Sequence, residues 1–443
     1  MPTQRNRRTR TRAAALTAVA LLAATTAAAA PATGATRFPE PPPALPTSNP
    51  APAASGCSTA YRITQKLSGG TTWRMCWRYD IDAGLVLDRI TYQPPGARVP
   101  IPVLNSARLA QIHVPYDDGG AEYDDLTGAG FGWGLQNLKP AECPGGTLTT
   151  IKVPEVGDVK GLCTTTRARG HAYRMASDGG SKVWQAQAKD LLVYTVNKTG
   201  WYEYITEWRF TADGTIGTNV GATGSLSPVD YDATDDRGWP LGKGSRDYAT
   251  SHAHNIFWKL DFGLDGSTKD RIEQYDSTVT TPTGGGGPTV KTKRTVITKE
   301  LAGDAKNMRW WRVVSGTGKN ADGHARSYEI APGHTDTHAG RAFTRHDVYF
   351  TQSRACERFA SNNIGGCASP AGDSVDTWVN GETLTRPTVW VNIGFHHIAR
   401  DEDQQPMPVH WQGFQLVPRD VTAMNPLTPP DLASENGRPD LGS

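Results

Sequence analysis

The sequence predicts a mainly β protein, and three observations lead to this fold class. The chain is rich in glycine, proline and tryptophan, with 47, 31 and 13 copies, a composition that suits many strands joined by tight turns. Short segments of β-branched and aromatic residues follow one another, separated by Gly/Asp turns such as 212–214 and 264–266. Long amphipathic helical patterns are missing, and only residues 339–345 and 353–361 show short ones.

The expected strands can be placed in order along the chain. They cover residues 72–79, 84–92, 111–115, 182–196, 201–210, 215–220, 255–262, 289–297 and 388–393. The Gly-rich loop 282–288 is predicted to be flexible, but β-type sequence continues after it, so it need not separate two domains. The chain length fits either two domains or one long all-β domain.

Residues 1–33 have the pattern of a secretory signal peptide: five arginines, an apolar Ala/Leu/Val run, and then small residues. The apolar run is too short to span a bilayer and no later stretch is apolar enough, so we expect a secreted, extracellular protein without membrane contact. Removing the five arginines lowers the formal charge from +2 to −3, which offers no basic surface for nucleic acid. Residues 34–56 are predicted to be a Pro/Ala-rich linker, and residues 431–443 a C-terminal tail.

Six cysteines fall into three pairs of near neighbours in the sequence. An even number of cysteines in an exported chain indicates disulfides. The expected pairs are Cys57–Cys76, Cys143–Cys163 and Cys356–Cys367. Six cysteines allow fifteen connectivities, and the sequence alone does not choose among them.

Two histidines one residue apart, His252 and His254, lie in an apolar and aromatic segment. Alternate side chains of a β-strand share a face, so both imidazoles are expected to lie close enough to bind one metal ion. Residues 394–400 follow a strand-like segment, contain two more histidines and are the best source of a third ligand. Three imidazoles with open positions suit copper(II) or zinc. The alternative is a His-x-His pair that forms only a polar face of a strand.

The segment around residue 202 resembles a known family. Residues 200–208 read Gly-Trp-Tyr-Glu-Tyr-Ile-Thr-Glu-Trp, followed by Asp-Gly-Thr-Ile at 213–216 and Gly-Ala-Thr-Gly at 221–224. This pattern is similar to that of the copper amine oxidases, whose cofactor tyrosine lies in an Asn-Tyr-Asp/Glu-Tyr motif ahead of similar runs. On that pattern Tyr202 matches the tyrosine that becomes topaquinone.

The metal-binding motifs of the same family also have counterparts. Residues 248–254 resemble the segment with its His-x-His, and residues 394–403 resemble its later Gly-x-x-His-x-Pro-Arg-x-Glu-Asp, with alanine at the proline position. The resemblance therefore implies His252, His254 and His397 as the copper ligands, with His397 rather than His396 in the ligand position.

Two further segments resemble parts of the family's active site. Residues 109–116 match the segment whose tyrosine hydrogen-bonds the quinone, which implies that role for Tyr116. Residues 123–132 match the segment with the catalytic aspartate, which implies Asp125, with Asp124 as the alternative. Cys143 and Cys163 match the family's disulfide partners.

The resemblance covers about residues 73–430, the family's catalytic domain. It implies a large antiparallel β-sandwich over residues 57–430, few short helices and a homodimer. It also implies that copper(II) and dioxygen convert Tyr202 to topaquinone. The implied reaction takes a small primary amine and dioxygen to an aldehyde, ammonia and hydrogen peroxide, with Asp125 as the general base. The amine itself is left open.

The sequence departs from the family pattern in four places. Trp201 stands where the family has an asparagine that holds the orientation of the quinone, and an indole cannot make the same contacts. The loop from Tyr116 to Asp125 is shorter than usual. Only Asp261 remains of an Asp-x-Asp that binds calcium in relatives, so calcium is not expected. The small N-terminal domains of many relatives have no counterpart.

Two other functions are compatible with the same sequence. One is a copper-binding protein or accessory subunit that keeps the three histidines but has no quinone turnover. The other is an exported β-sandwich that binds carbohydrate through aromatic surface residues. Metal analysis separates the carbohydrate-binding alternative from the others, and a stain for quinone separates the enzyme from the copper-binding protein.

Overall fold

The computed structural model describes residues 56–117, 121–228, 237–243, 247–281, 286–306, 308–364, 367 and 373–432. All of them belong to one compact unit, residues 43–443. The predicted signal peptide, all of the predicted linker except Gly56, and all but the first two residues of the predicted tail lie outside the described residues.

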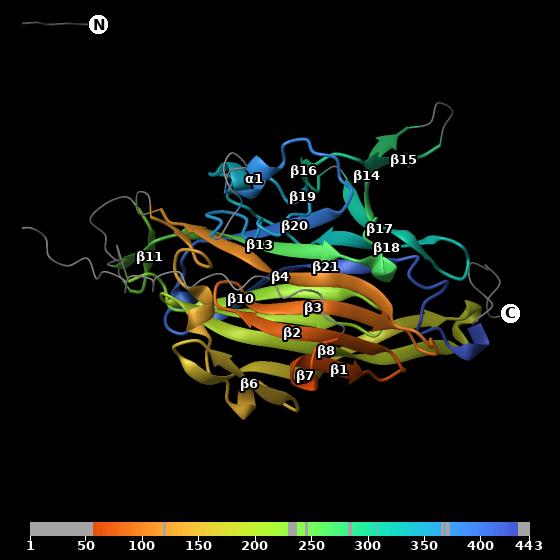
Figure 1. Ribbon diagram of the computed structural model, residues 1–443, viewed down its shortest axis with the longest axis horizontal. Coiled ribbons are helices and arrows are strands. Elements are labelled where there is room, and N and C mark those ends of the chain that lie inside the picture. The colour runs from red at the N-terminus through yellow and green to blue at the C-terminus, as the bar shows by residue number, and fades with distance from the viewer. Residues whose placement is uncertain are drawn as a thin grey trace, which may run out of the picture. The chain divides into compact units, whose positions relative to one another are not determined.

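Two large antiparallel sheets make up the fold, and the first contains nine strands among the described residues (Figure 1). Its order is β1 (Arg62–Lys66), β2 (Thr72–Asp80), β3 (Gly84–Gln93), β4 (Ile101–Pro115), β13 (His252–Phe262), β20 (Pro387–His397), β19 (Val348–Gln352) and β16 (Leu301–Gly303), with β5 (Glu122–Asp124) paired to β4. Strand β13 is central and is buried at every position except Asp261. Its polar residues, among them His252, His254 and Asn255, are therefore buried together with its apolar ones.

The second sheet contains ten strands among the described residues. Its order is β15 (Thr289–Ile297), β14 (Arg271–Thr280), β17 (Trp310–Lys319), β18 (Ala325–Pro332), β21 (Met407–Arg419), β10 (Ile216–Gly224), β9 (Tyr202–Phe210), β8 (Val183–Thr199), β7 (Gly157–Ala176) and β6 (Thr147–Val153). A separate two-stranded ribbon joins β11 (Trp239–Leu241) to β12 (Asp247–Ala249). The predicted mainly β, antiparallel sandwich is confirmed.

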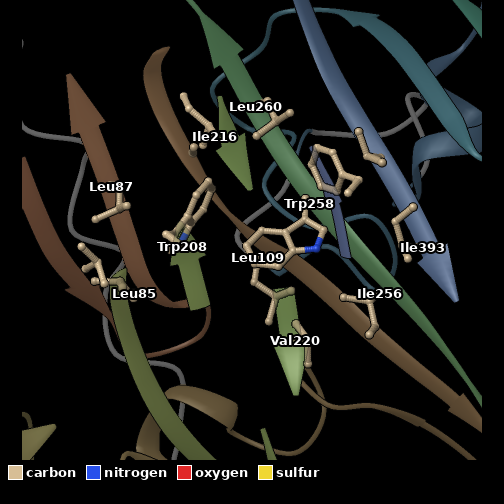
Figure 2. Packing of buried hydrophobic residues seen from close by; sticks show 14 of the residues in the cluster. Leu85, Leu87, Leu109, Trp208, Ile216, Val220, Ile256, Trp258, Leu260 and Ile393 are labelled. Atoms are coloured by element: carbon tan, nitrogen blue, oxygen red, sulfur yellow. The ribbon is translucent and has the colours of Figure 1, made fainter. Parts of the chain in front are cut away.

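The two sheets pack face to face through large apolar side chains. Trp208 of β9 meets Trp258 of β13 edge to face, with ring centroids 5.1 Å apart, and both side chains are fully buried. Figure 2 shows these two rings among Leu109, Ile256 and Val220, which come from strands of both sheets. Burying each such side chain stabilises the fold by roughly 1.5–3 kcal/mol, so this layer holds the sheets together.

Of the two segments with short helical patterns, residues 339–345 contain a 3-10 helix, and the prediction for residues 353–361 was wrong. The 3-10 helix is Ala342–Thr344, and the second segment contains no helix. In the second, the side-chain oxygen of Asn363 accepts hydrogen bonds from the backbone N–H groups of Arg358 and Phe359. Those donors are therefore not available to helical carbonyls. The α-helix of the described residues is Val375–Trp378 (α1).

Three disulfides link Cys57 to Cys76, Cys143 to Cys163 and Cys356 to Cys367, as the sequence led us to expect. The described residues contain no unpaired cysteine. Among the same residues, no helix has the length and the apolar character that crossing a bilayer requires.

Candidate active site

Three imidazoles and one phenol meet at one end of the sandwich. His252 lies directly opposite His397 in the register of β13 and β20, and their ring centroids are 4.9 Å apart. The His252 and His254 ring centroids are also 4.9 Å apart, as expected for side chains on the same face of a strand. The structure thus brings the three predicted ligands together, while His396 lies on the opposite face of β20 and is exposed.

Tyr202 projects from β9 of the opposite sheet into this group of imidazoles. Its hydroxyl oxygen lies 2.6 Å from His252 Nε2 and 2.9 Å from His397 Nδ1. Its ring packs edge-on against His254, with centroids 5.0 Å apart, and the side chain is only 3% exposed. The residue predicted to carry the cofactor is therefore in contact with all three predicted metal ligands.

The second nitrogen of each imidazole has its own partner, which fixes the orientation of the ring. His397 Nε2 lies 2.9 Å from a carboxylate oxygen of Asp403. His252 Nδ1 lies 3.5 Å from the carbonyl oxygen of Thr250, and His254 Nδ1 lies 3.4 Å from the hydroxyl of Tyr204. Such partners on the outer nitrogen are typical of metal-binding histidines, because they leave the inner lone pair for the metal.

The donor set fits a copper(II) ion. His254 Nε2 is buried and has no hydrogen-bond partner, which is costly unless another group binds it. Burial lowers the pKa of His252 to about 3 and holds that of His254 well below its usual value, so both rings are neutral. In the part of the chain that the structure describes, no three His, Cys, Asp or Glu side chains form a complete metal site. Two of the nitrogens that would bind the metal, His252 Nε2 and His397 Nδ1, lie within hydrogen-bonding distance of the Tyr202 phenol oxygen.

Asp125 and Asp124 have different surroundings, although they are neighbours. Asp125 is buried, and burial raises the pKa of its carboxyl group to about 7, while a hydrogen bond from the Tyr204 hydroxyl acts in the opposite direction. Asp124 faces away from it and binds His113 Nδ1 at 2.9 Å and the Ser361 hydroxyl at 3.0 Å. Of the two carboxylates, Asp125 is therefore the one beside the phenol and imidazole group.

Tyr116 directly follows the long strand β4 and lies against the same group. Its ring stacks on His252 with centroids 4.7 Å apart, and the backbones of the two residues form an isolated β-bridge. The indole Nε1 of Trp201 donates a hydrogen bond of 2.9 Å to the Tyr116 hydroxyl. The indole at the family's asparagine position thus contacts the predicted quinone-binding tyrosine directly.

Sequence reasoning did not single out Tyr204 and Asp403, although both orient imidazoles. A signal for Tyr204 was present, because it lies two residues after Tyr202 and must share its face of β9. Asp403 lies in the segment that supplies His397, but its distance from the ring depends on the turn at Asp401–Asp403. The contact of Trp201 with Tyr116 joins residues 85 positions apart, so no local sequence pattern predicts it.

At the position of the family's calcium site, Asp261 is engaged within the protein. One of its carboxylate oxygens accepts a hydrogen bond of 2.7 Å from the Thr388 hydroxyl. Its partner strand β20 therefore supplies a hydroxyl donor next to the single remaining carboxylate. A hydroxyl donor at this place stabilises the carboxylate.

Comparison with known proteins gives a consistent result. The family model described as "Copper amine oxidase, enzyme domain" matches residues 70–431. Histamine oxidase from Arthrobacter globiformis is 26% identical over 392 residues, which cover 80% of this chain and 55% of that protein. Copper-containing amine oxidase alpha 2 from Arabidopsis thaliana is 25% identical, over 83% of this chain and 60% of its own. The chain spans somewhat more than half the length of these relatives.

Solved structures show the same fold. A copper-containing benzylamine oxidase from Hansenula polymorpha superposes with a TM-score of 0.68 at 22% identity, over 82% of this chain and 62% of that one. An amine oxidase from Aspergillus nidulans gives a TM-score of 0.69 at 20% identity, over 81% and 52%. At these identities the likeness shows the fold and no more.

Proposed function

Because the chain belongs to the copper amine oxidase family, we propose that it is a secreted primary-amine oxidase that uses copper(II) and a topaquinone formed from Tyr202. The observation that carries the proposal is the position of the Tyr202 hydroxyl, 2.6 Å and 2.9 Å from the nitrogens of two histidines on the opposite sheet. In the proposed reaction a small primary amine, dioxygen and water give an aldehyde, ammonia and hydrogen peroxide.

His252, His254 and His397 would hold the copper(II). Support comes from the unpartnered, buried Nε2 of His254 and from the partners on the outer nitrogens of all three rings. The carboxylate of Asp403 would accept a hydrogen bond from His397 Nε2–H, which fixes the tautomer that leaves Nδ1 for the metal. When formed, topaquinone supplies the carbonyl that takes up the amine and the capacity to accept two electrons.

Asp125 is the proposed general base that removes a proton from the carbon next to the amine nitrogen. Burial raises its pKa to about 7, so a large fraction is both deprotonated and basic at neutral pH. The alternative, Asp124, is held by His113 and Ser361, which argues against it. We therefore expect amine oxidation to rise with pH through about pH 7.

Tyr116 and Tyr204 would orient the reacting groups. Tyr116 stacks on His252, and its hydroxyl is the proposed partner of a quinone oxygen. The Tyr204 ring stacks on the Tyr202 ring, with centroids 5.6 Å apart and planes 18° from parallel. Packing on one face of the Tyr202 ring limits how far that ring can rotate.

Export and dimer formation are part of the same proposal. The three disulfides support export, because disulfides persist in oxidising compartments outside the cytosol. Val279 and Val290 face each other across β14 and β15 and are 66% and 58% exposed, which supports a homodimer contact at this hairpin. Size-exclusion chromatography with light scattering tests the dimer, and a Val279→Lys variant should favour the monomer.

The decisive experiment is to load copper-free protein with copper(II) in air. We expect one copper per chain, development of colour, a positive quinone stain, and peroxide release with a primary amine. Tyr202→Phe should abolish colour and peroxide while copper still binds. Tyr328→Phe is the matched control, because its hydroxyl is also buried and donates to the Gly214 carbonyl, 3.0 Å away.

A different result would favour the copper-binding alternative. Wild-type protein that binds copper stoichiometrically, stays colourless and releases no peroxide from any amine would refute the enzyme. Protein that binds no copper would refute both and leave only an exported β-sandwich.

A further inference from the structure

Trp201 is placed between the candidate active site and the surface. It directly precedes Tyr202, and its indole Nε1–H donates a hydrogen bond of 2.9 Å to the Tyr116 hydroxyl. An indole nitrogen can only donate, so the Tyr116 oxygen is the acceptor in this bond. The two rings also pack edge to face, with centroids 6.0 Å apart.

The Trp201 contact reaches the imidazole group through one intermediate residue. The Tyr116 ring lies 4.7 Å from the His252 ring and is nearly parallel to it. Tyr123 packs edge-on against both Tyr116 and Trp201, with centroid distances of 5.7 Å and 5.9 Å. A shift of the indole would therefore move Tyr116 relative to His252.

The backbone holds Trp201 in place. The N–H of Ser225 donates to the Trp201 carbonyl over 3.0 Å. Gly224 has a φ of +110°, and a Cβ added there would lie 2.5 Å from the same carbonyl oxygen. Only glycine permits this close approach, so the chain at Gly224 and Ser225 fixes the backbone of Trp201.

The indole also forms one wall of a surface pocket of about 330 Å³. The other lining residues are Lys198, Glu203, Gly224, Ser225, Gln405 and Pro406. The nitrogen edge of the Trp201 indole thus contacts Tyr116, and Trp201 also lines the solvent-open pocket.

We propose that Trp201 is a positioning residue: its indole N–H fixes the Tyr116 hydroxyl and, through the stacked ring, the relation of Tyr116 to His252. The inference rests on the proposed function, because Tyr116 acts there on the quinone. It gives the indole a role that differs from that of the family's asparagine, since the indole acts on Tyr116 rather than on the cofactor.

The first test uses copper-free protein and requires no activity. In protein labelled with ¹⁵N at its 13 tryptophan indoles, Trp201→Phe should remove one resonance and so identify it. Tyr116→Phe should shift that resonance and speed its hydrogen exchange roughly fivefold, because one hydrogen bond of about 1 kcal/mol is lost. The control is Trp184, whose indole donates to Asp431 over 3.0 Å and should be unaffected by Tyr116→Phe. An unmoved Trp201 resonance would overturn the proposal.

The second test uses copper-loaded enzyme and a double-mutant cycle. Trp201→Phe and Tyr116→Phe should each lower kcat by roughly three- to tenfold with little change in KM. The kcat of the double variant should be no lower than that of the less active single variant. Losses that multiply would show that Trp201 does not act through Tyr116. A wild-type protein without turnover would refute the proposed function, and the indole resonance would then show separately whether the Trp201–Tyr116 bond exists.

Discussion

The two ends of strands β13 and β9 follow one structural rule and have different chemistry. At one end the inward residues of β13 are His252 and His254, which face Tyr202 and Tyr204 of β9. At the other end Trp258 of β13 meets Trp208 of β9. The same alternation of side chains therefore builds a polar group and an apolar core along one pair of strands.

The difference lies in how each end is stabilised. Apolar side chains need only close packing, whereas each buried polar atom needs a hydrogen-bonding or metal partner. At the polar end an imidazole nitrogen, His254 Nε2, has no such partner, and burial raises the pKa of Asp125; at the apolar end the indole N–H groups of Trp208 and Trp258 also have none. The polar end thus contains reactive groups that lower the stability of the fold. Substitutions at the polar end should change chemistry, and substitutions at the apolar end should change stability.

The largest effect is expected at the general base. Asp125→Asn keeps the shape of the side chain but cannot take up a proton, so reduction of the quinone by amine should slow by about 10²–10⁴-fold. Stopped-flow bleaching of the quinone colour measures this step. Asp124→Asn is the control and should lose less than about tenfold, because Asp124 binds His113 and Ser361 instead. Full activity in Asp125→Asn would show that another residue is the general base.

At the apolar end, Trp258→Ala should destabilise the fold by about 3–5 kcal/mol, because it leaves a cavity between the sheets. Urea unfolding followed by circular dichroism measures the change. Trp239→Ala, at a side chain 52% exposed, should change the free energy of unfolding by less than about 0.5 kcal/mol. Equal losses in the two variants would contradict the assignment of the core to the β9–β13 layer.

Stability should depend on pH at the polar end in a defined direction. The pKa of Asp125 is about 7 in the folded protein and 3.8 as its ordinary value, so unfolding releases a proton between these pH values. Its contribution to stability therefore falls as pH rises from 3.8 to about 7 and is constant above that. Asparagine does not titrate. Relative to wild type, the free energy of unfolding of copper-free Asp125→Asn should therefore rise by about 2–3 kcal/mol between pH 5 and pH 7. A difference in unfolding free energy between variant and wild type that stays constant with pH would show that the pKa of Asp125 is not raised in the folded protein.

The smallest effect is expected one step away from the proposed metal. Asp403→Asn should weaken copper(II) binding about 10–100-fold, because the amide no longer accepts the His397 Nε2–H as a carboxylate does. Competitive titration with a chelator measures the affinity. Asp401→Asn is the control, because Asp401 accepts from the Gly242 N–H, 2.6 Å away, and is exposed. Equal affinity in wild type and Asp403→Asn would mean that this carboxylate does not tune the site.

Much of the fold was predictable from local patterns. Strands at 72–79, 84–92, 201–210 and 255–262 were placed within a few residues, because segments of β-branched and aromatic residues between turn residues are local signals. The 20-residue strand Gly157–Ala176 was not predicted, because polar and charged residues dominate it and many of its positions are exposed. Sheet order could not be predicted, because it depends on contacts between distant segments.

The sequence by itself determined which residue types are present, their alternation on strands, the pairs of neighbouring cysteines and the motifs that resemble an amine oxidase. The same resemblance favours His397 over His396 and Asp125 over Asp124. Only the tertiary structure decided that the His252 and His397 rings meet, that the Asp125 carboxyl group lies against Tyr204, and that Trp201 holds Tyr116. The physical reason is that strand alternation fixes which side chains share a face. Which face meets which partner depends on register and packing between segments far apart in the chain.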